Sequence, residues 1–215
     1  MKKSFYVEFI GMPASGKSYY KNILIKNLNK RDIITNNFYE LKKIGKLFFL
    51  FLFFLKYPYY SIKIFNIFFH LNFENKETRK HFYYFINEAS LRIYQDYKKK
   101  IVINSEGFRY RAVYYLYSLR NKLNKNYLKK FINESPGIHL IIYVESNKKI
   151  NIKRSRKRKG GYKYSNQDLV SYSEKIKIIK KICSETKKKA VVIKITKKNQ
   201  KKDLQKILDI IKKFN

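Results

Sequence analysis

Short apolar runs alternate with longer segments that carry apolar residues at helical spacing along most of this 215-residue chain. The runs are rich in β-branched and aromatic residues, as buried strands are, and lie at 4–10, 101–103, 138–144 and 190–195. Helices are predicted between and after them, at 19–28, 77–97, 108–119, 122–133, 148–157, 167–184 and 203–213. Strands separated by helices predict an α/β fold with a parallel sheet covered on both faces, in a single domain over 1–215.

The segment 41–73 interrupts this alternation with an unbroken apolar run from Leu47 to Leu55. The run lies between Lys46 and Lys56 and is too short to span a bilayer, which takes about 20 apolar residues. One interpretation is a helical insertion or acceptor-side region that packs on the core or forms a lid. Another is an interfacial element, with aromatic side chains and lysines at an anionic lipid surface. A third interpretation is a surface that binds a hydrophobic acceptor or a partner protein.

The most specific motif follows the first predicted strand and opens the first predicted helix. It matches G-x-x-x-x-G-K-[ST] over Gly11, Met12, Pro13, Ala14, Ser15, Gly16, Lys17 and Ser18. In this setting the backbone N–H groups of the loop turn toward an anion at the positive end of the helix dipole. The two glycines allow the tight turn, and Lys17 can reach the β- and γ-phosphates. Ser18 offers a hydroxyl to Mg²⁺, so the motif predicts ATP and Mg²⁺ as cofactors.

The chain is strongly basic, with a formal net charge of +35 from 50 Lys and Arg against 15 Asp and Glu. Lys far outnumbers Arg, and Ile, Asn, Tyr and Phe are frequent, which is typical of a compositional bias. We therefore favour general phosphate affinity over a dedicated nucleic-acid site. Cys183 is the single cysteine, so the chain forms no internal disulfide, and a cytoplasmic location is expected. The basic start at 1–3 leads into a strand rather than a signal peptide.

Glu106 follows the predicted strand 101–103 and is the candidate catalytic carboxylate. Phosphoryl transfer needs such a group near the metal, at the carboxyl end of a neighbouring strand. Asn104 and Ser105 stand where an Asp is expected, so Glu106 either holds Mg²⁺ through water or acts as base toward an acceptor hydroxyl. A solvent-facing Glu without a role is the alternative. Arg109 and Arg111 are weaker candidates for an anionic acceptor and are expected on a helix surface.

A second candidate site is the basic, lid-like segment 153–163, which is unusually rich in arginine. Arg forks bind phosphate oxygens in a bidentate manner and can neutralise charge on a transferring phosphoryl group. Arg154 and Arg158 lie one helical turn apart and share a face, so they are predicted as catalytic lid residues. Gly160 and Gly161 are suited to a hinge. A solvated basic run or an RNA-contacting patch is the alternative.

The order of P-loop, apolar strand with an acidic turn, strand ending in Tyr143-Val144-Glu145 and Arg-bearing helix resembles the thymidylate kinase and nucleoside-monophosphate kinase group. The resemblance covers most of the chain, but only the P-loop is a specific motif. It implies a P-loop NTPase three-layer sandwich with a five-stranded parallel sheet. It also implies Lys17 and Ser18 on phosphate and magnesium, with Arg154 or Arg158 in the lid.

These observations predict an ATP-dependent phosphotransferase that moves the γ-phosphoryl group to a small acceptor. A nucleotide, a sugar or another hydroxyl compound would fit, because no acceptor motif is found. The alternative is a non-catalytic or weakly hydrolytic P-loop protein that binds nucleotide and acts at a membrane surface or on RNA. Peripheral membrane contact would run through 41–73, and nucleic acid is the less favoured partner.

Overall fold

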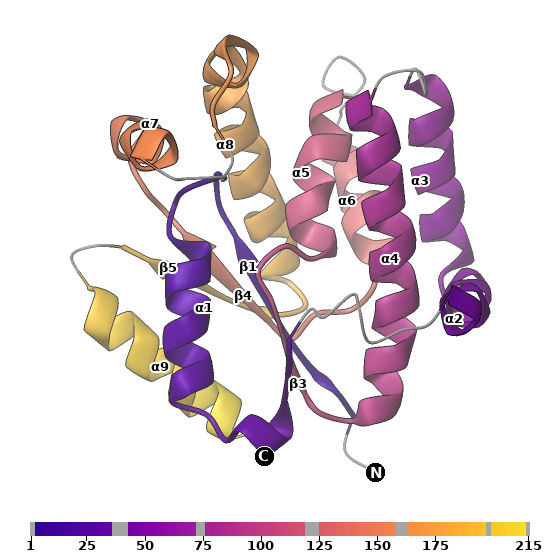
Figure 1. The fold of residues 1–215 in the computed structure, drawn as a ribbon, viewed down its shortest axis with the longest axis horizontal. Coiled ribbons are helices and arrows are strands. Elements are labelled where there is room, and N and C mark those ends of the chain that lie inside the picture. Colours follow the sequence, from indigo (N-terminus) through magenta and orange to yellow (C-terminus); the bar gives the residue numbers. More distant parts are fainter. Residues whose placement is uncertain are drawn as a thin grey trace.

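The computed structural model of the chain describes residues 3–35, 43–71, 76–118, 125–157, 163–196 and 199–213. Its sheet is built from the strands β1 (Phe5–Ile10), β2 (Ile33–Thr35), β3 (Ile101–Asn104), β4 (Leu140–Val144) and β5 (Val191–Ile195). The strand order is β2-β3-β1-β4-β5, and every neighbouring pair is parallel. The carboxyl ends of the strands therefore meet at one edge, with β1 in the centre (Figure 1).

Helices cover both faces of the sheet (Figure 1). On one face lie α1 (Lys17–Lys26) and α9 (Gln200–Lys212), and the short 3₁₀ helix η1 (Lys30–Asp32) leads from α1 into β2. The other face carries α4 (Lys76–Lys98), α5 (Phe108–Ser118), α6 (Lys125–Glu134) and α8 (Asn166–Thr186). The helix α7 (Lys148–Lys157) follows β4. The predicted α/β three-layer sandwich with a five-stranded parallel sheet is confirmed.

Each face of the sheet has its own hydrophobic core. Successive side chains of β1 point to opposite faces, as in any strand. Leu24 of α1 and Ile207 of α9 share one core with alternate residues of the strand, namely Phe5, Val7 and Phe9. Ile10 at the end of the strand belongs to the other core, together with Ala112 of α5. Because both faces are buried, β1 reads as a continuous apolar run apart from Glu8.

The apolar segment forms two helices, α2 (Lys43–Lys56) and α3 (Pro58–His70), which join at a bend of 108°. Pro58 opens α3, where its missing N–H costs no helical hydrogen bond. Phe53 of α2 stacks on Phe108 of α5 with ring centroids 5.6 Å apart, and Tyr60 of α3 packs on Phe131 of α6 at 5.3 Å. One side of both helices is therefore part of the core.

No single helix among the described residues is long and apolar enough to cross a membrane. The bent pair of α2 and α3 passes that test together, by length and composition alone.

Candidate functional site

The loop between β1 and α1 adopts a conformation that depends on its glycines. Gly11 has φ of 155°, and a Cβ there would lie 2.6 Å from the carbonyl oxygen of Val144 at the end of β4. Gly16 has φ of 108° and is the N-cap residue of α1, so it offers no side chain to the first N–H groups of that helix. Ala14 also has a positive φ, of 59°. The loop and the first turn of α1 form a cradle of the kind that binds phosphate.

The side chains around this cradle come from the loop itself and from α5. The Lys17 Nζ atom donates hydrogen bonds to the carbonyl oxygens of Gly11 at 2.9 Å and Met12 at 3.1 Å. The ring of Tyr110, from α5, lies under the same ammonium at 4.4 Å. The Ser15 hydroxyl is buried and has no hydrogen-bond partner among the described residues, whereas Ser18 is exposed in the first turn of α1. The Lys17 side chain therefore lies against the loop, and a change of its rotamer would bring the ammonium to a phosphate bound there.

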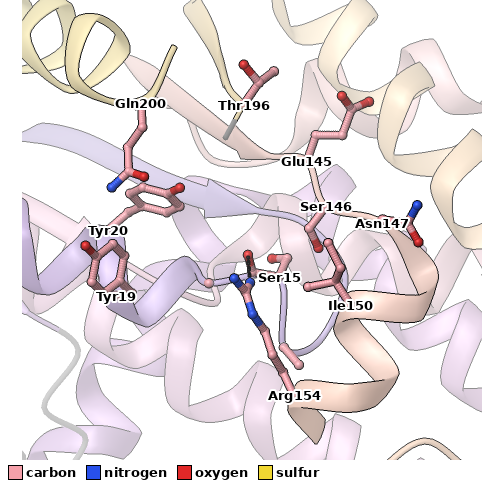
Figure 2. Close-up of a pocket in the computed structure, with 12 residues that line it drawn as sticks. Ser15, Tyr19, Tyr20, Glu145, Ser146, Asn147, Ile150, Arg154, Thr196 and Gln200 are labelled. Atoms are coloured by element: carbon pink, nitrogen blue, oxygen red, sulfur yellow. Dashed lines mark hydrogen bonds between the residues drawn. The ribbon is translucent and has the colours of Figure 1, made fainter. Parts of the chain in front are cut away.

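A pocket of about 840 Å³ opens beside the loop (Figure 2). Its walls come from the start of α1, from the segment after β4 and from the segment after β5. They are lined by Ala14, Ser15, Gly16, Tyr19, Tyr20, Glu145, Ser146, Asn147, Ile150, Arg154, Thr196 and Gln200. Clefts of this size hold drug-sized ligands, and in open α/β sheets ligands bind beyond the carboxyl ends of the strands. The aromatic and polar lining suits a nucleoside whose phosphates reach the loop.

Arg154 connects α7 to the loop. Its Nη1 atom lies 3.4 Å from the carbonyl oxygen of Ser15, and Figure 2 shows the side chain pointing from α7 toward Ser15. Asn147 begins α7 by accepting a hydrogen bond from the Lys149 N–H at 2.8 Å. The buried Asn151 amide then bonds to Tyr172 of α8 at 2.8 Å, which fixes the helix that carries Arg154.

The lid-like segment is described only in part. Its residues 153–157 are the last turns of α7, whereas Arg158, Gly160 and Gly161 lie outside the described residues. Beyond that gap, the Tyr164 hydroxyl donates a hydrogen bond to the Pro13 carbonyl at 2.7 Å. Both sides of the predicted lid thus contact the P-loop.

Glu106 lies in the turn between β3 and α5, with its side chain half exposed. Its Oε2 atom is 3.6 Å from Arg111 Nη2. Burial lowers the pKa of Lys21 on α1, and the Glu106 carboxylate opposes that shift, so the carboxylate lies in electrostatic reach of α1. This turn stands at the carboxyl edge of the sheet, next to β1 and its loop. Glu106 is therefore accessible to a ligand that approaches the loop from the α5 side.

Glu8 is a residue near the site that the sequence patterns did not single out. Its buried carboxylate accepts a hydrogen bond from the Tyr110 N–H at the start of α5, at 2.6 Å. A Cβ on Gly107 would lie 2.6 Å from the Glu8 Cδ atom, so this glycine makes room for the carboxylate. Burial raises the pKa of Glu8 to about 7, while Arg109 and the N–H bonds oppose the shift. Glu8 thereby ties the central strand to the turn that carries Glu106. A charged residue within an otherwise apolar strand was the available signal.

Arg109 and Arg111 were expected on a helix surface, and this expectation is wrong because both side chains are buried. Arg111 Nε lies 3.1 Å from the Oε2 atom of buried Glu88 on α4, and its guanidinium lies 4.2 Å from the Tyr84 ring. Arg109 donates a hydrogen bond to the Ser135 hydroxyl after α6. These contacts of α5 with α4 and with the residue after α6 bury two arginine side chains that the sequence alone places in solvent.

The protein oxygens near the loop fit a magnesium ion that arrives with a nucleotide. Within the part of the chain that the structure describes, no three His, Cys, Asp or Glu side chains gather as a metal site. Nucleotide-bound Mg²⁺ needs just one or two protein oxygens, with phosphates and water as its other ligands. The exposed Ser18 hydroxyl and the half-exposed Glu106 carboxylate are donors of this kind.

Comparison with known proteins gives a distant structural likeness. No protein-family model matches the chain, and no curated protein matches its sequence. A solved structure that matches is a deoxyadenosine kinase from M. mycoides with bound dCTP. The TM-score is 0.44 at 15% sequence identity, over 97% of this chain and 100% of that chain. A likeness this distant says nothing of activity, so the function is argued from the site.

Proposed function

We propose that this protein is an ATP-dependent phosphotransferase that transfers the γ-phosphoryl group to a hydroxyl of a small molecule. The observation that supports the proposal most is the contact of Arg154 with the P-loop at the mouth of the 840 Å³ pocket. A P-loop that merely holds a nucleotide needs no arginine above its phosphates, whereas transfer benefits from one that neutralises developing charge. The resemblance to the thymidylate and nucleoside-monophosphate kinase group belongs to the same proposal.

The nucleotide and the acceptor would bind on different sides of the loop. The nucleoside would occupy the pocket between Tyr20, Asn147 and Thr196, with its phosphates on the loop N–H groups. Lys17 would leave the loop carbonyls for the β- and γ-phosphates, and Arg154 would contact the γ-phosphate. The Ser18 hydroxyl and the Glu106 carboxylate would hold a nucleotide-bound Mg²⁺, which would supply positive charge to offset that of the phosphates.

The acceptor would approach from the α5 side, where Glu106 is half exposed. Its carboxylate would orient the acceptor hydroxyl or take its proton as the oxygen attacks phosphorus. The P–O bond to the β-phosphate then breaks and ADP leaves. The salt bridge to Arg111 would hold Glu106 in place.

The first test is Lys17→Ala, measured by ATP binding and by ADP release. We expect at least a tenfold loss of turnover, as for removal of a strong charge–phosphate contact. The matched control is Lys26→Ala, because Lys26 is exposed in the last turn of the same helix. Unchanged binding and turnover in Lys17→Ala would contradict the proposal.

The second test is a screen of nucleosides, nucleoside monophosphates and sugars for stimulation of ADP release. A stimulating acceptor that Glu106→Gln no longer converts, while ATP still binds, would support the assigned role of Glu106. ATP binding with no acceptor-stimulated turnover across the panel would favour a nucleotide-binding protein instead. Full activity in Glu106→Gln would remove Glu106 from the mechanism.

A further inference from the structure

The helix α2 carries a row of large apolar side chains that the fold leaves in solvent. Leu47, Phe48, Phe51 and Leu55 are between 57% and 69% exposed. Their spacing places them along one side of the helix, which we call the exposed face of α2. Single exposed apolar residues are ordinary, but a contiguous row of them marks an interaction surface.

The opposite side of α2 already accounts for its packing in the fold. Phe53 is fully buried against Phe85 of α4 and Phe108 of α5, and Ser90 of α4 donates a hydrogen bond to the Lys46 carbonyl at 2.9 Å. The helix is therefore apolar on both sides, and one of these sides packs on the fold. A helix that is hydrophobic all round is expected inside a protein core or in a membrane.

Aromatic and basic side chains also flank α2, from α4 and at its own C-terminal end. Tyr97 on α4 is itself exposed and packs against Phe49 of α2, with ring centroids 6.0 Å apart. Lys98 lies beside it, with its ammonium 5.1 Å from the Tyr94 ring. Lys56, at the end of α2, is half exposed although it pairs with Asp96 at 2.8 Å. Exposed tyrosine and lysine side chains beside an apolar helix are typical of an element that lies in a lipid interface.

We propose that the exposed face of α2 binds the surface of an anionic lipid bilayer, with its Leu and Phe side chains below the headgroups. Charge complementarity selects this occupant, because a chain of net charge +35 is attracted to anionic lipid. The same charge opposes contact between two copies of the chain through this face. In Figure 1, α2 lies away from α7, the helix that contributes Ile150 and Arg154 to the pocket. Bilayer binding requires neither ATP nor an acceptor.

The test is flotation of the full chain with phosphatidylcholine vesicles, with and without phosphatidylglycerol. We expect binding to the anionic vesicles that weakens as salt is raised, because the attraction between exposed charges is screened. The double variant Phe48→Ser with Phe51→Ser should bind at least about tenfold more weakly, since two buried aromatic rings are removed from the interface. The matched control is Val170→Ser, because Val170 is an exposed apolar residue on α8.

The double variant changes exposed side chains and should keep its fold, which circular dichroism and ATP binding would verify. Equal vesicle binding by the double variant and the parent chain would overturn the proposal. So would equal binding to vesicles with and without phosphatidylglycerol. A dimer of the parent chain in sedimentation that the double variant abolishes would assign the face to a second copy instead.

Discussion

The two sides of the P-loop are built in different ways. On the pocket side, Arg154 is exposed, and the walls are strand ends and helix starts around open space. On the α5 side the ionisable groups are buried: Arg111 pairs with Glu88, and Glu8 accepts a hydrogen bond from the Tyr110 N–H. An exposed group interacts with a ligand at little cost to the fold, whereas a buried charge depends on its partners. The pocket side should therefore tolerate substitution with loss of ligand binding alone, and the α5 side should lose stability.

The largest effect on stability is expected for Arg111→Ala. The substitution leaves Glu88 buried without its guanidinium partner, and it also removes the salt bridge to Glu106. We expect the free energy of unfolding to fall by about 3–5 kcal/mol, as when one member of a buried ion pair is removed. Urea unfolding followed by circular dichroism measures the change. Arg79→Ala, an exposed arginine of α4, is the control and should stay within about 0.5 kcal/mol of the parent.

The second test concerns the pH dependence of stability that Glu8 creates. Burial raises its pKa to about 7 in the folded chain, above the ordinary value of 4.5 that applies when the chain unfolds. A raised carboxyl pKa means that the folded chain prefers the protonated form. The contribution of Glu8 is then fully present below about pH 4.5 and is lost as pH rises toward 7, by up to about 3 kcal/mol.

Glu8→Gln keeps the shape of the side chain and removes its titration. Unfolding in urea at a series of pH values between 4 and 8, at steps of about one unit, should show a flatter curve for the variant than for the parent. Identical slopes for the two chains would mean that Glu8 is ionised throughout and that Arg109 compensates its burial.

The same contrast explains which features the sequence predicts. The loop from Gly11 to Ser18 is recognisable from the sequence because the residues that form it are consecutive in the chain. Its conformation depends on its own glycines. The sheet is recognisable because strands buried on both faces are continuous apolar runs, although β2, with three residues, is too short to give such a run. Arg154 is also a local feature, since it stands in an arginine-rich helix.

The α5 side was not predictable in this way. Glu8 and Tyr110 are 102 residues apart, and Glu88 reaches Arg111 from another helix. Whether an arginine of an amphipathic helix is buried depends on which other elements pack over it. The local spacing of apolar residues does not carry that information. Arg109 and Arg111 were placed on a surface for that reason, and the structure corrects it.

Gly107→Ala gives a smaller effect on the same side. The new Cβ would lie 2.6 Å from the Glu8 Cδ atom, so the carboxylate would shift away from the Tyr110 N–H. We expect a loss of about 1–3 kcal/mol, the usual cost of overpacking a buried site. Gly137→Ala is the matched control, because a Cβ at Gly137 meets nothing within 4 Å. If both variants unfold at the same urea concentration, Glu8 can move at no cost, and its part in positioning the Glu106 turn is refuted.

Arg154→Ala should have the smallest effect on stability and still alter function. Among the described residues the exposed guanidinium makes one long hydrogen bond, to the Ser15 carbonyl, so the free energy of unfolding should change by less than about 0.5 kcal/mol. Without the guanidinium, the phosphates of the bound nucleotide would be held less tightly, which should raise the KM for ATP or lower kcat about tenfold. Arg156→Ala, an exposed arginine two residues further along α7, is the control and should change neither quantity. Were Arg154→Ala to unfold more easily while ATP turnover stayed intact, Arg154 would be a structural contact, and the two sides of the loop would not differ as proposed.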